Sequence, residues 1–158
     1  MILMFKEIDP YTVRYWIAYA AYLSLSNLIW EAAQLPLYTL WDQDINTIVF
    51  SIIHCTGGDV LIGMFSLGIA YGLFRLTGRR LGLAVRQRGI AFCAILFGLG
   101  YTVFSEWLNV YVRKSWAYSD LMPLINVGDF GIGLSPILQW LVIPTAFFVW
   151  KGRVRLNL

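Results

Sequence analysis

Four long apolar stretches dominate the pattern of hydrophobic and polar positions along the chain. They cover about residues 13–35, 47–74, 89–112 and 134–150, and a helix needs about 20 apolar residues, with a range of about 17–25, to cross a bilayer. Pro36 ends the first stretch, and Pro144 predicts a kink inside the short fourth one. The pattern therefore predicts an all-α membrane protein, a four-transmembrane-helix bundle that forms a single domain over residues 1–158.

Composition supports this interpretation. Hydrophobic residues make up 59% of the chain and charged residues 13%, whereas a soluble domain carries about 25% charged residues. Lipid must therefore cover much of the surface. Basic residues do not alternate with aromatic ones in a polar context, so no nucleic acid partner is expected. The first stretch is too long for the apolar core of a cleaved signal peptide, and we expect it to be retained.

Basic residues give the predicted bundle an orientation. Ten of them lie in the N-terminal segment, the connection at about 75–88 and the C-terminal tail: Lys6, Arg14, Arg75, Arg79, Arg80, Arg86, Arg88, Lys151, Arg153 and Arg155. The other side carries only Arg113 and Lys114. The positive-inside rule then places both termini and the 75–88 connection in the cytoplasm. An even number of crossings requires both termini to lie on one side, and the charges agree.

The two outer connections, at about 36–46 and 113–133, differ in character. The second contains Trp116, Tyr118, Met122 and Phe130, so it is too apolar for a solvated linker. We expect it to fold back over the outer end of the bundle, because long loops of this kind often serve as lids or binding loops.

Ionisable residues of the predicted helices gather at one depth. With a rise of about 1.5 Å per residue, Glu31, His54 and Glu106 fall roughly 10 Å above the bilayer midplane, and Asp59 falls somewhat closer to it. The inner half of each helix is nearly free of such groups until its cytoplasmic end. Asn27 and Gln34 share a face with Glu31, Asn109 shares one with Glu106, and Gln139 reaches the same level from the fourth helix.

This polar layer favours a functional site over a purely structural one. A charge in hydrocarbon costs at least about 2.5–3.5 kcal/mol, so intramembrane ionisable residues face the interior, pair or take up protons. Hydrogen bonds that hold membrane helices together, worth about 0.6–2 kcal/mol each, are the alternative. Three carboxyls and one imidazole exceed that need, although for Gln139 alone the structural role is favoured.

Two features of the second helix remain open at this point. His54, the only histidine, is either a proton acceptor near neutral pH or a structural partner of Asp59 or Glu106. Gly57 and Gly58 would allow either a ligand or a neighbouring helix to approach closely, and helix packing is the favoured explanation.

The first functional hypothesis is a site in the outer half of the membrane that binds a hydrophobic molecule, either as a binding site alone or as an enzyme that converts it by acid–base chemistry. The predicted catalytic residues are Glu31, His54, Asp59 and Glu106. The carboxylic acids would donate a proton and His54 would accept one. The predicted ligand-binding residues are Asn27, Gln34, Tyr38, Asn109, Trp116, Tyr118, Gln139 and Trp140.

Two other hypotheses stay open beside it. One is a metal site formed by Glu31, His54, Asp59 and Glu106, whose N and O ligands suit zinc, manganese or iron, although no HxxxH, ExxH or CxxC spacing occurs. The other is an accessory subunit of a larger membrane complex, with a membrane protein as partner. The sequence specifies no cofactor.

Five strings carry a resemblance to a known group of proteins: WExxQxPLY at 30–38, HCTxxD at 54–59, SEWxN at 105–109, WAYSDxMP at 116–123 and GLSPxxQW at 133–140. In these strings the chain resembles a group of small bacterial four-helix membrane proteins with no assigned activity. The resemblance covers most of residues 27–150. It implies a multi-pass protein of the bacterial inner membrane, and it brings no activity with it.

Overall fold

The computed structural model describes residues 10–77 and 82–156, and these fold into four long helices and one small hairpin. The α-helices are α1 (Pro10–Gln34), α2 (Ile45–Thr77), α3 (Leu83–Trp107) and α4 (Leu134–Leu156). The hairpin consists of β1 (Leu124–Val127) and β2 (Phe130–Gly133), which pair antiparallel. The predicted four-helix architecture is confirmed, and each helix begins and ends within about six residues of its predicted bounds.

Three of the four helices are long and apolar enough to cross a membrane. They cover Ile45–Thr77, Ala84–Val112 and Leu134–Gly152. The helix α1 has 25 residues but is not among the three. Its polar side chains face the other helices, since Asn27 and Gln34 are buried, whereas its exposed face is apolar, with Ile17 63% and Leu25 62% exposed.

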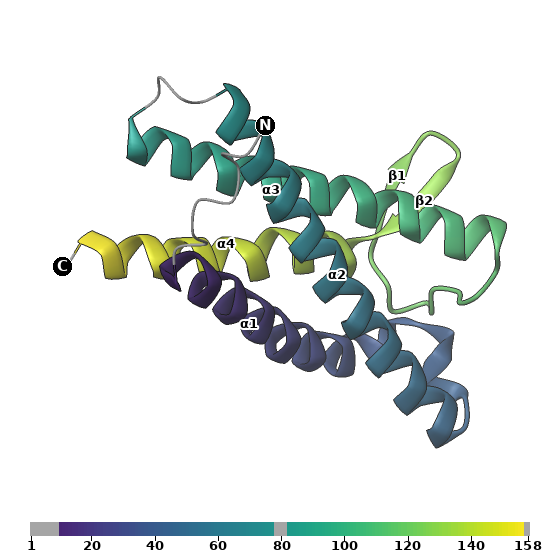
Figure 1. Ribbon diagram of the computed structural model, residues 1–158. Helices are drawn as coiled ribbons and strands as arrows, with labels where there is room; N and C mark the ends of the chain where they lie inside the picture. The colour runs from purple at the N-terminus through teal and green to yellow at the C-terminus, as the bar shows by residue number, and fades with distance from the viewer. Residues whose placement is uncertain (1–9, 78–81, 157–158) are drawn as a thin grey trace, which may run out of the picture.

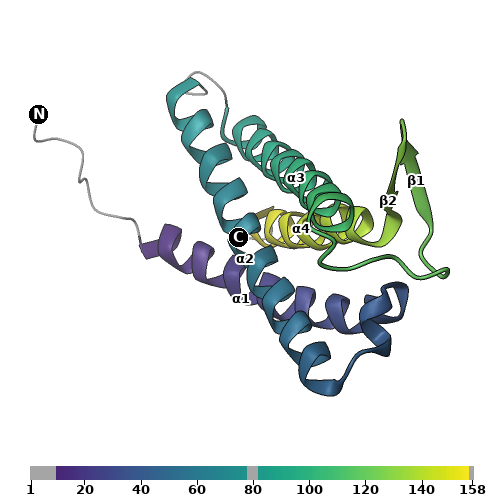
Figure 2. The same cartoon turned by 90° about the vertical axis from the view of Figure 1, so that its right-hand side faces the viewer.

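The helices α2 and α4 lie on opposite sides of the pair formed by α1 and α3. Both α2 and α4 contact α1 and α3. Figure 2 looks nearly along α4, which lies between α1 and α3, while α2 crosses obliquely on the other side. The helices α2 and α3 are close where the chain connects them and diverge toward their other ends (Figure 2). The bundle is therefore splayed at one end.

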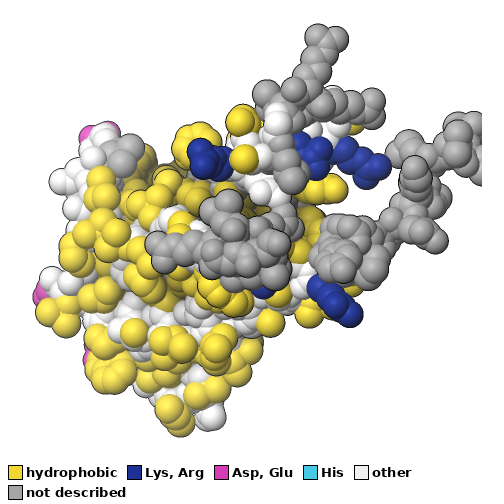
Figure 3. Space-filling model, turned by 90° about the vertical axis from the view of Figure 1, so that its left-hand side faces the viewer, with side chains coloured by type: hydrophobic (Ala, Val, Ile, Leu, Met, Phe, Trp, Pro, Cys, Tyr) yellow, Lys and Arg dark blue, Asp and Glu magenta, His cyan; other side chains and the backbone are white. Residues whose placement is uncertain are grey.

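The two ends of the bundle differ in composition. The start of α1, the end of α2, the start of α3 and the end of α4 lie at one end, which we call the inner end, opposite the hairpin (Figure 1). Lys and Arg side chains appear at this end, while most of the visible surface is hydrophobic (Figure 3). Lys6, Arg79 and Arg80 of the predicted basic set lie outside the described residues.

The apolar core fills the inner half of the bundle. It contains Tyr19 and Leu23 of α1, Leu67 and Ala70 of α2, Ala94 of α3, and Ile143 and Phe147 of α4. In sequence each of these residues lies closer to the inner end of its helix than the polar residues of the predicted layer. Close packing in this half leaves the polar side chains to the outer half.

The two outer connections pair with each other across the outer end. The first contains the short 3-10 helices η1 (Leu35–Leu37) and η2 (Thr39–Asp42), separated by Tyr38. Tyr38 forms a single β-bridge with Tyr118 of the second connection. The Ser119 N–H donates to the Leu37 carbonyl at 3.0 Å, and its hydroxyl donates to the Pro36 carbonyl at 2.9 Å. The second connection thus folds back over the bundle, as its apolar residues predict.

Local sequence explains how the second connection turns. After α3 the chain makes a π-helical turn, η3 (Leu108–Val112), and Lys114 then adopts a left-handed φ of 55°. The hairpin reverses at Gly128, whose φ of 61° is readily available to glycine at a two-residue turn. The Tyr111 hydroxyl donates to the Gly131 carbonyl at 2.7 Å and anchors β2 to η3.

Candidate functional site

Two carboxyl groups from different helices meet at one amide in the outer half of the bundle. The Gln139 Nε2 of α4 lies 3.0 Å from Glu31 Oε1 of α1 and 2.8 Å from Asp59 Oδ2 of α2. It also lies 3.0 Å from Asn27 Oδ1. The Asp59 and Glu31 side chains are within hydrogen-bonding reach of each other. Gln139, only 2% exposed, therefore joins α1, α2 and α4.

A chain of hydrogen bonds continues from this carboxyl pair toward the outer end. Gln34 Nε2 donates to the same Glu31 oxygen at 2.8 Å, and Ser135 Oγ donates to Gln34 Oε1 at 2.7 Å. Trp30 Nε1 in turn donates to Ser135 Oγ at 3.2 Å. These contacts fix the orientation of Glu31, because donors from α1 and α4 hold its carboxyl.

A third carboxyl, Glu106 of α3, forms a separate centre with two tyrosines of the outer connections. The Tyr118 hydroxyl donates to Glu106 Oε2 at 2.7 Å, and the Tyr38 hydroxyl donates to the same oxygen at 3.4 Å. Burial, and next the charge of Glu106, raise the pKa of both tyrosines well above the ordinary value. Both hydroxyls therefore remain protonated donors, and they link Glu106 to the paired connections.

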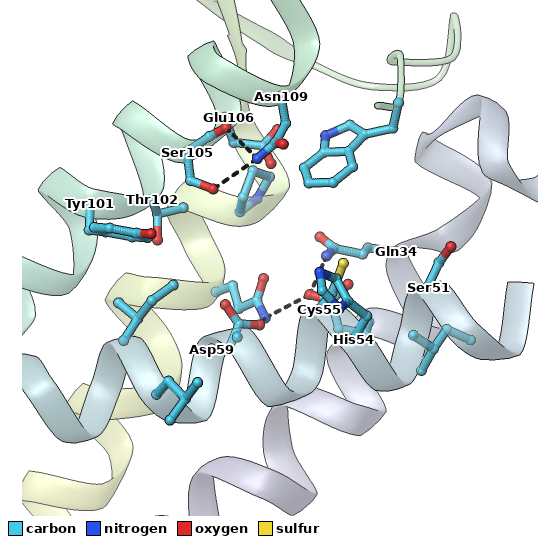
Figure 4. Close-up of a pocket in the computed structure, with 18 of the residues that line it drawn as sticks. Gln34, Ser51, His54, Cys55, Asp59, Tyr101, Thr102, Ser105, Glu106 and Asn109 are labelled. Atoms are coloured by element: carbon cyan, nitrogen blue, oxygen red, sulfur yellow. Dashed lines mark hydrogen bonds between the residues drawn. The ribbon is translucent and has the colours of Figure 1, made fainter. Parts of the chain in front are cut away.

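A cavity of about 710 Å³ lies between these two centres. Its walls come from α2 and α3, and α1 and α4 contribute Glu31, Gln34, Pro136 and Gln139. In Figure 4, His54, Cys55 and Asp59 lie along α2, across the cavity from Thr102, Ser105 and Glu106 of α3. Ligand sites usually measure about 300–1,000 Å³ and combine apolar walls with a few polar groups. This cavity has that character.

Several buried polar atoms at the cavity have no hydrogen-bond partner. Among the described residues they include Thr102 Oγ1 and Trp116 Nε1, which belong to lining residues, and Trp116 lies near Glu106. Trp140 Nε1 near Asp59 and Asn27 Nδ2 also lack a partner within hydrogen-bond geometry, but these two residues do not line the cavity. An unpaired buried donor costs about 1–3 kcal/mol. Such atoms are rare in folded proteins, and at a cavity they mark positions where a bound molecule can supply the missing acceptor.

Most residues of the sequence-predicted site surround this cavity. Nine of them line it: Glu31, Gln34, Tyr38, His54, Asp59, Glu106, Asn109, Trp116 and Gln139. Asn27, Tyr118 and Trp140 do not line it. Asn27 and Tyr118 instead hydrogen-bond to lining residues, and Trp140 lies beside Asp59.

His54 takes part in neither of its expected pairings. Its side chain is exposed, and its ring stacks on that of Phe50 with the centroids 5.5 Å apart. Among the described residues, no hydrogen bond joins His54 to Asp59 or Glu106. His54 therefore lies at the edge of the cavity and apart from the carboxyl pair.

Gly57 and Gly58 do not pack against a neighbouring helix. A Cβ atom added at either position would meet no other atom within 4 Å, and Gly58 lines the cavity. The favoured packing explanation was wrong, since the close helix contacts occur at other glycines. A Cβ at Gly98 would overlap the Trp140 ring, and one at Gly63 would overlap Leu23.

The sequence-based prediction missed several apolar residues of the wall. On α2, Leu61, Phe65 and Ile69 line the cavity, and on α3, Phe97 and Tyr101 do so. The spacing of four residues within each set, continued on α3 by Ser105 and Asn109, was a visible signal of one helix face. It was missed because apolar residues in a membrane helix are as common on lipid-facing surfaces as on cavity walls, whereas ionisable ones are rare.

Within residues 10–77 and 82–156, no group of three or more His, Cys, Asp and Glu side chains is arranged to hold a metal ion. Glu31 and Asp59 are together, but His54 and Glu106 are apart from them. Comparison of the chain with protein-family models, with curated proteins and with solved structures gives no match. Any function must therefore be argued from the site itself.

Proposed function

We propose that this chain is a multi-pass membrane protein whose cavity binds a hydrophobic small molecule and converts it by acid–base chemistry. Three apolar helices support the membrane assignment. We include α1 as a fourth crossing, because its polar side chains face the bundle while Ile17, Leu25 and Ile29 remain more than 60% exposed. In water such a surface would be costly, whereas lipid covers it without penalty.

The proposed orientation places the inner end in the cytoplasm and the cavity in the outer leaflet of a bacterial inner membrane. Arg75, Arg86 and Arg88 flank the α2–α3 connection at the inner end, near the end of α4 with Lys151. Basic residues favour the cytoplasmic side of such membranes. Both termini would then be cytoplasmic, and the hairpin would face outward.

The observation that carries the proposal is the coincidence of the cavity with the carboxyl groups. Glu31, Asp59 and Glu106 come from three helices and line one space of about 710 Å³. A network that only joined helices would be packed solid, because empty space beside buried polar groups loses contacts and adds nothing to helix association. The empty volume beside these carboxyls supports a binding role.

The Glu31–Asp59 pair suits proton transfer. Two carboxylates this close in a medium of low dielectric do not both carry a charge readily, and such pairs share a proton, as in aspartic proteases. Gln139 keeps both groups oriented by donating to each. The pair would give a proton to a bound molecule and take one back, and Glu106 would act as a second acid or base across the cavity.

A deuterium experiment tests this function even when the substrate is unidentified. Purified protein in liposomes made from a bacterial lipid extract is incubated in deuterated water, and the lipid-phase molecules are analysed by mass spectrometry. Reversible proton transfer should introduce deuterium at carbon into one hydrophobic species with the wild-type protein. Glu31→Gln and Asp59→Asn should abolish this labelling.

The matched control is Asp120→Asn, which makes the same chemical change at an exposed residue of the outer connection. This variant should label at the wild-type rate. The absence of any labelled species with the wild-type protein would overturn the proposal. Equal labelling by wild type, Glu31→Gln and Asp59→Asn would overturn it as well, since the carboxyl pair would then have no part in the exchange.

A further inference from the structure

The cavity is open sideways, between α2 and α3. Leu61, Phe65 and Ile69 of α2 line it and are also 60%, 68% and 54% exposed at the helix surface. On the facing helix, Phe97 and Tyr101 line it and are 37% and 53% exposed. The same side chains thus belong both to the cavity and to the outer surface of the helices that diverge in Figure 2.

This opening lies within the membrane-spanning part of the helices. Residues 61–69 run from the middle of the α2 span toward the inner end, and residues 97–101 lie in the middle of the α3 span. Across the outer end, by contrast, the two connections are joined by backbone hydrogen bonds, with the Thr39 N–H donating to the Ala117 carbonyl at 3.0 Å. Apolar walls at this depth favour entry from lipid over entry from water.

The unpaired donors specify the polar end of the molecule. Thr102 is only 7% exposed, lines the cavity beside Tyr101, and its hydroxyl has no partner. The Trp116 indole N–H, also unpaired, can only donate. A bound molecule must therefore bring an oxygen that accepts a hydrogen bond. An alkylammonium group could donate to the Thr102 hydroxyl oxygen, but it has no lone pair to offer and would leave the Trp116 N–H unpaired.

The charges at the cavity exclude an anionic head group. Three carboxyls line the cavity, and among the described lining residues the only cation is Arg113, which is exposed. A phosphate or carboxylate would meet like charges within a medium of low dielectric, and such a juxtaposition costs several kcal/mol. The head group that fits both the donors and the acids is an uncharged oxygen.

We infer that the cavity takes a long-chain alcohol or ketone from the membrane, which enters between α2 and α3 and accepts a hydrogen bond from Thr102. This inference rests on the proposed function for the site, and it adds the substrate class and the route of entry. The apolar chain lies along Phe65, Ile69 and Tyr101, and its uncharged oxygen lies within the polar part of the cavity.

Photo-crosslinking tests the inference directly. Full-length protein in nanodiscs is exposed to a long-chain alcohol that carries a diazirine on its chain, and labelled peptides are mapped by mass spectrometry. Labelling should fall on α2 near residues 61–69 and on α3 near residues 97–101. The unlabelled alcohol and the matching ketone should compete, whereas an alkyl phosphate and an alkylamine of equal chain length should not.

Matched variants separate the cavity from the general helix surface. Gly58→Leu should abolish labelling, because Gly58 lines the cavity and a Cβ there meets no other atom within 4 Å, so the added side chain occupies cavity volume. Gly57→Leu should not change labelling, because a Cβ at Gly57 is equally unobstructed but lies outside the lining. Thr102→Val should weaken competition by the alcohol about two- to twelvefold, the value of one hydrogen bond. Thr145→Val, at an exposed position of α4, serves as its control.

The outcomes distinguish three claims: the head-group assignment, the route of entry into the cavity, and the proposed acid–base function. Competition by the phosphate or the amine as strong as that by the alcohol would overturn the head-group assignment. Labelling that Gly58→Leu leaves intact would overturn the route and the site. Specific capture of the alcohol without any exchange of deuterium from solvent would refute the proposed acid–base function alone and leave the present inference standing.

Discussion

Replacement of Gln139 by leucine tests whether the polar network stabilises the bundle. Leucine has a similar size, so the volume of the side chain is largely kept. The substitution removes the only donor that contacts Asn27, Glu31 and Asp59 together. We expect the Gln139→Leu protein to be less stable than wild type, because three acceptors from two neighbouring helices, one buried and two half-buried, lose a donor at once.

The magnitude follows from the geometry of the amide. Nε2 carries two hydrogens, so it makes at most two strong hydrogen bonds to the three acceptors at 2.8–3.0 Å. Hydrogen bonds between membrane helices contribute on average about 0.6 kcal/mol and at most about 1.7 kcal/mol each. The expected loss is therefore about 1–3 kcal/mol. Asn27→Leu should cost less, since Asn27 accepts only one of the contacts.

Reversible unfolding in mixed micelles, titrated with a denaturing detergent and followed by circular dichroism, gives the free energy of unfolding. The double variant should reveal a coupling of about 0.5 kcal/mol or more between positions 27 and 139, as expected for residues in contact. A Gln139→Leu protein within about 0.5 kcal/mol of wild type, the range of a surface substitution, would refute the reasoning. The network would then contribute nothing measurable to stability.

Three further predictions concern the helices and their connections. Gly98→Ala should destabilise the fold by about 1–3 kcal/mol, because its Cβ would overlap the buried Trp140 ring. Gly100→Ala, in open space, should be neutral or stabilise the fold by up to about 1 kcal/mol. Thermal unfolding measures both, and equal effects of the two substitutions would contradict the packing at Gly98. Tyr118→Phe should speed hydrogen–deuterium exchange in residues 113–123 more than Tyr38→Phe does, because its hydroxyl bond to the shared carboxylate is 2.7 Å against 3.4 Å. Hydrogen bonds from Thr47 lower the pKa of Asp44 below its ordinary value. The Asp44 carboxylate therefore stabilises α2 fully at pH values above its ordinary pKa, and this stabilisation is lost as the pH falls through the lowered pKa. The stability difference between wild type and Asp44→Ala should therefore shrink between about pH 6 and pH 3, and a constant difference would show that the carboxylate does not cap the helix.

The fold was largely predictable because long apolar stretches leave few alternatives. The length of the apolar stretches predicted the four helices, and Pro36 predicted where the first helix ends. The hairpin was missed, although Gly128-Asp129 between two four-residue strands is a recognised turn signal. The apolar composition of the second connection indicates that it lies over the bundle, but composition alone does not distinguish a short hairpin from an irregular loop.

The site was predictable in depth but not in direction around each helix. Depth counting brought Glu31, Asp59 and Glu106 to one level, and all three line the cavity. Depth counting also placed His54 at this level. His54 lies five positions before Asp59 in the chain, which corresponds to a rotation of about 140° around an α-helix. The two side chains therefore point in different directions. Which direction faces the bundle depends on how α2 crosses its neighbours, and one helix sequence does not contain that information.

The number of residues in the π-helical turn at Leu108–Val112 determines how the chain that follows is oriented. A π-turn accommodates about one residue more than an α-helical turn. Deletion of any single residue from it would restore α-helical spacing and rotate everything that follows by about 100°. Glu106 precedes the turn and would stay in place, whereas the Tyr111 hydroxyl would leave Gly131. Insertions and deletions in this turn would thus move the hairpin and the second connection, and would separate the Tyr118 hydroxyl from Glu106.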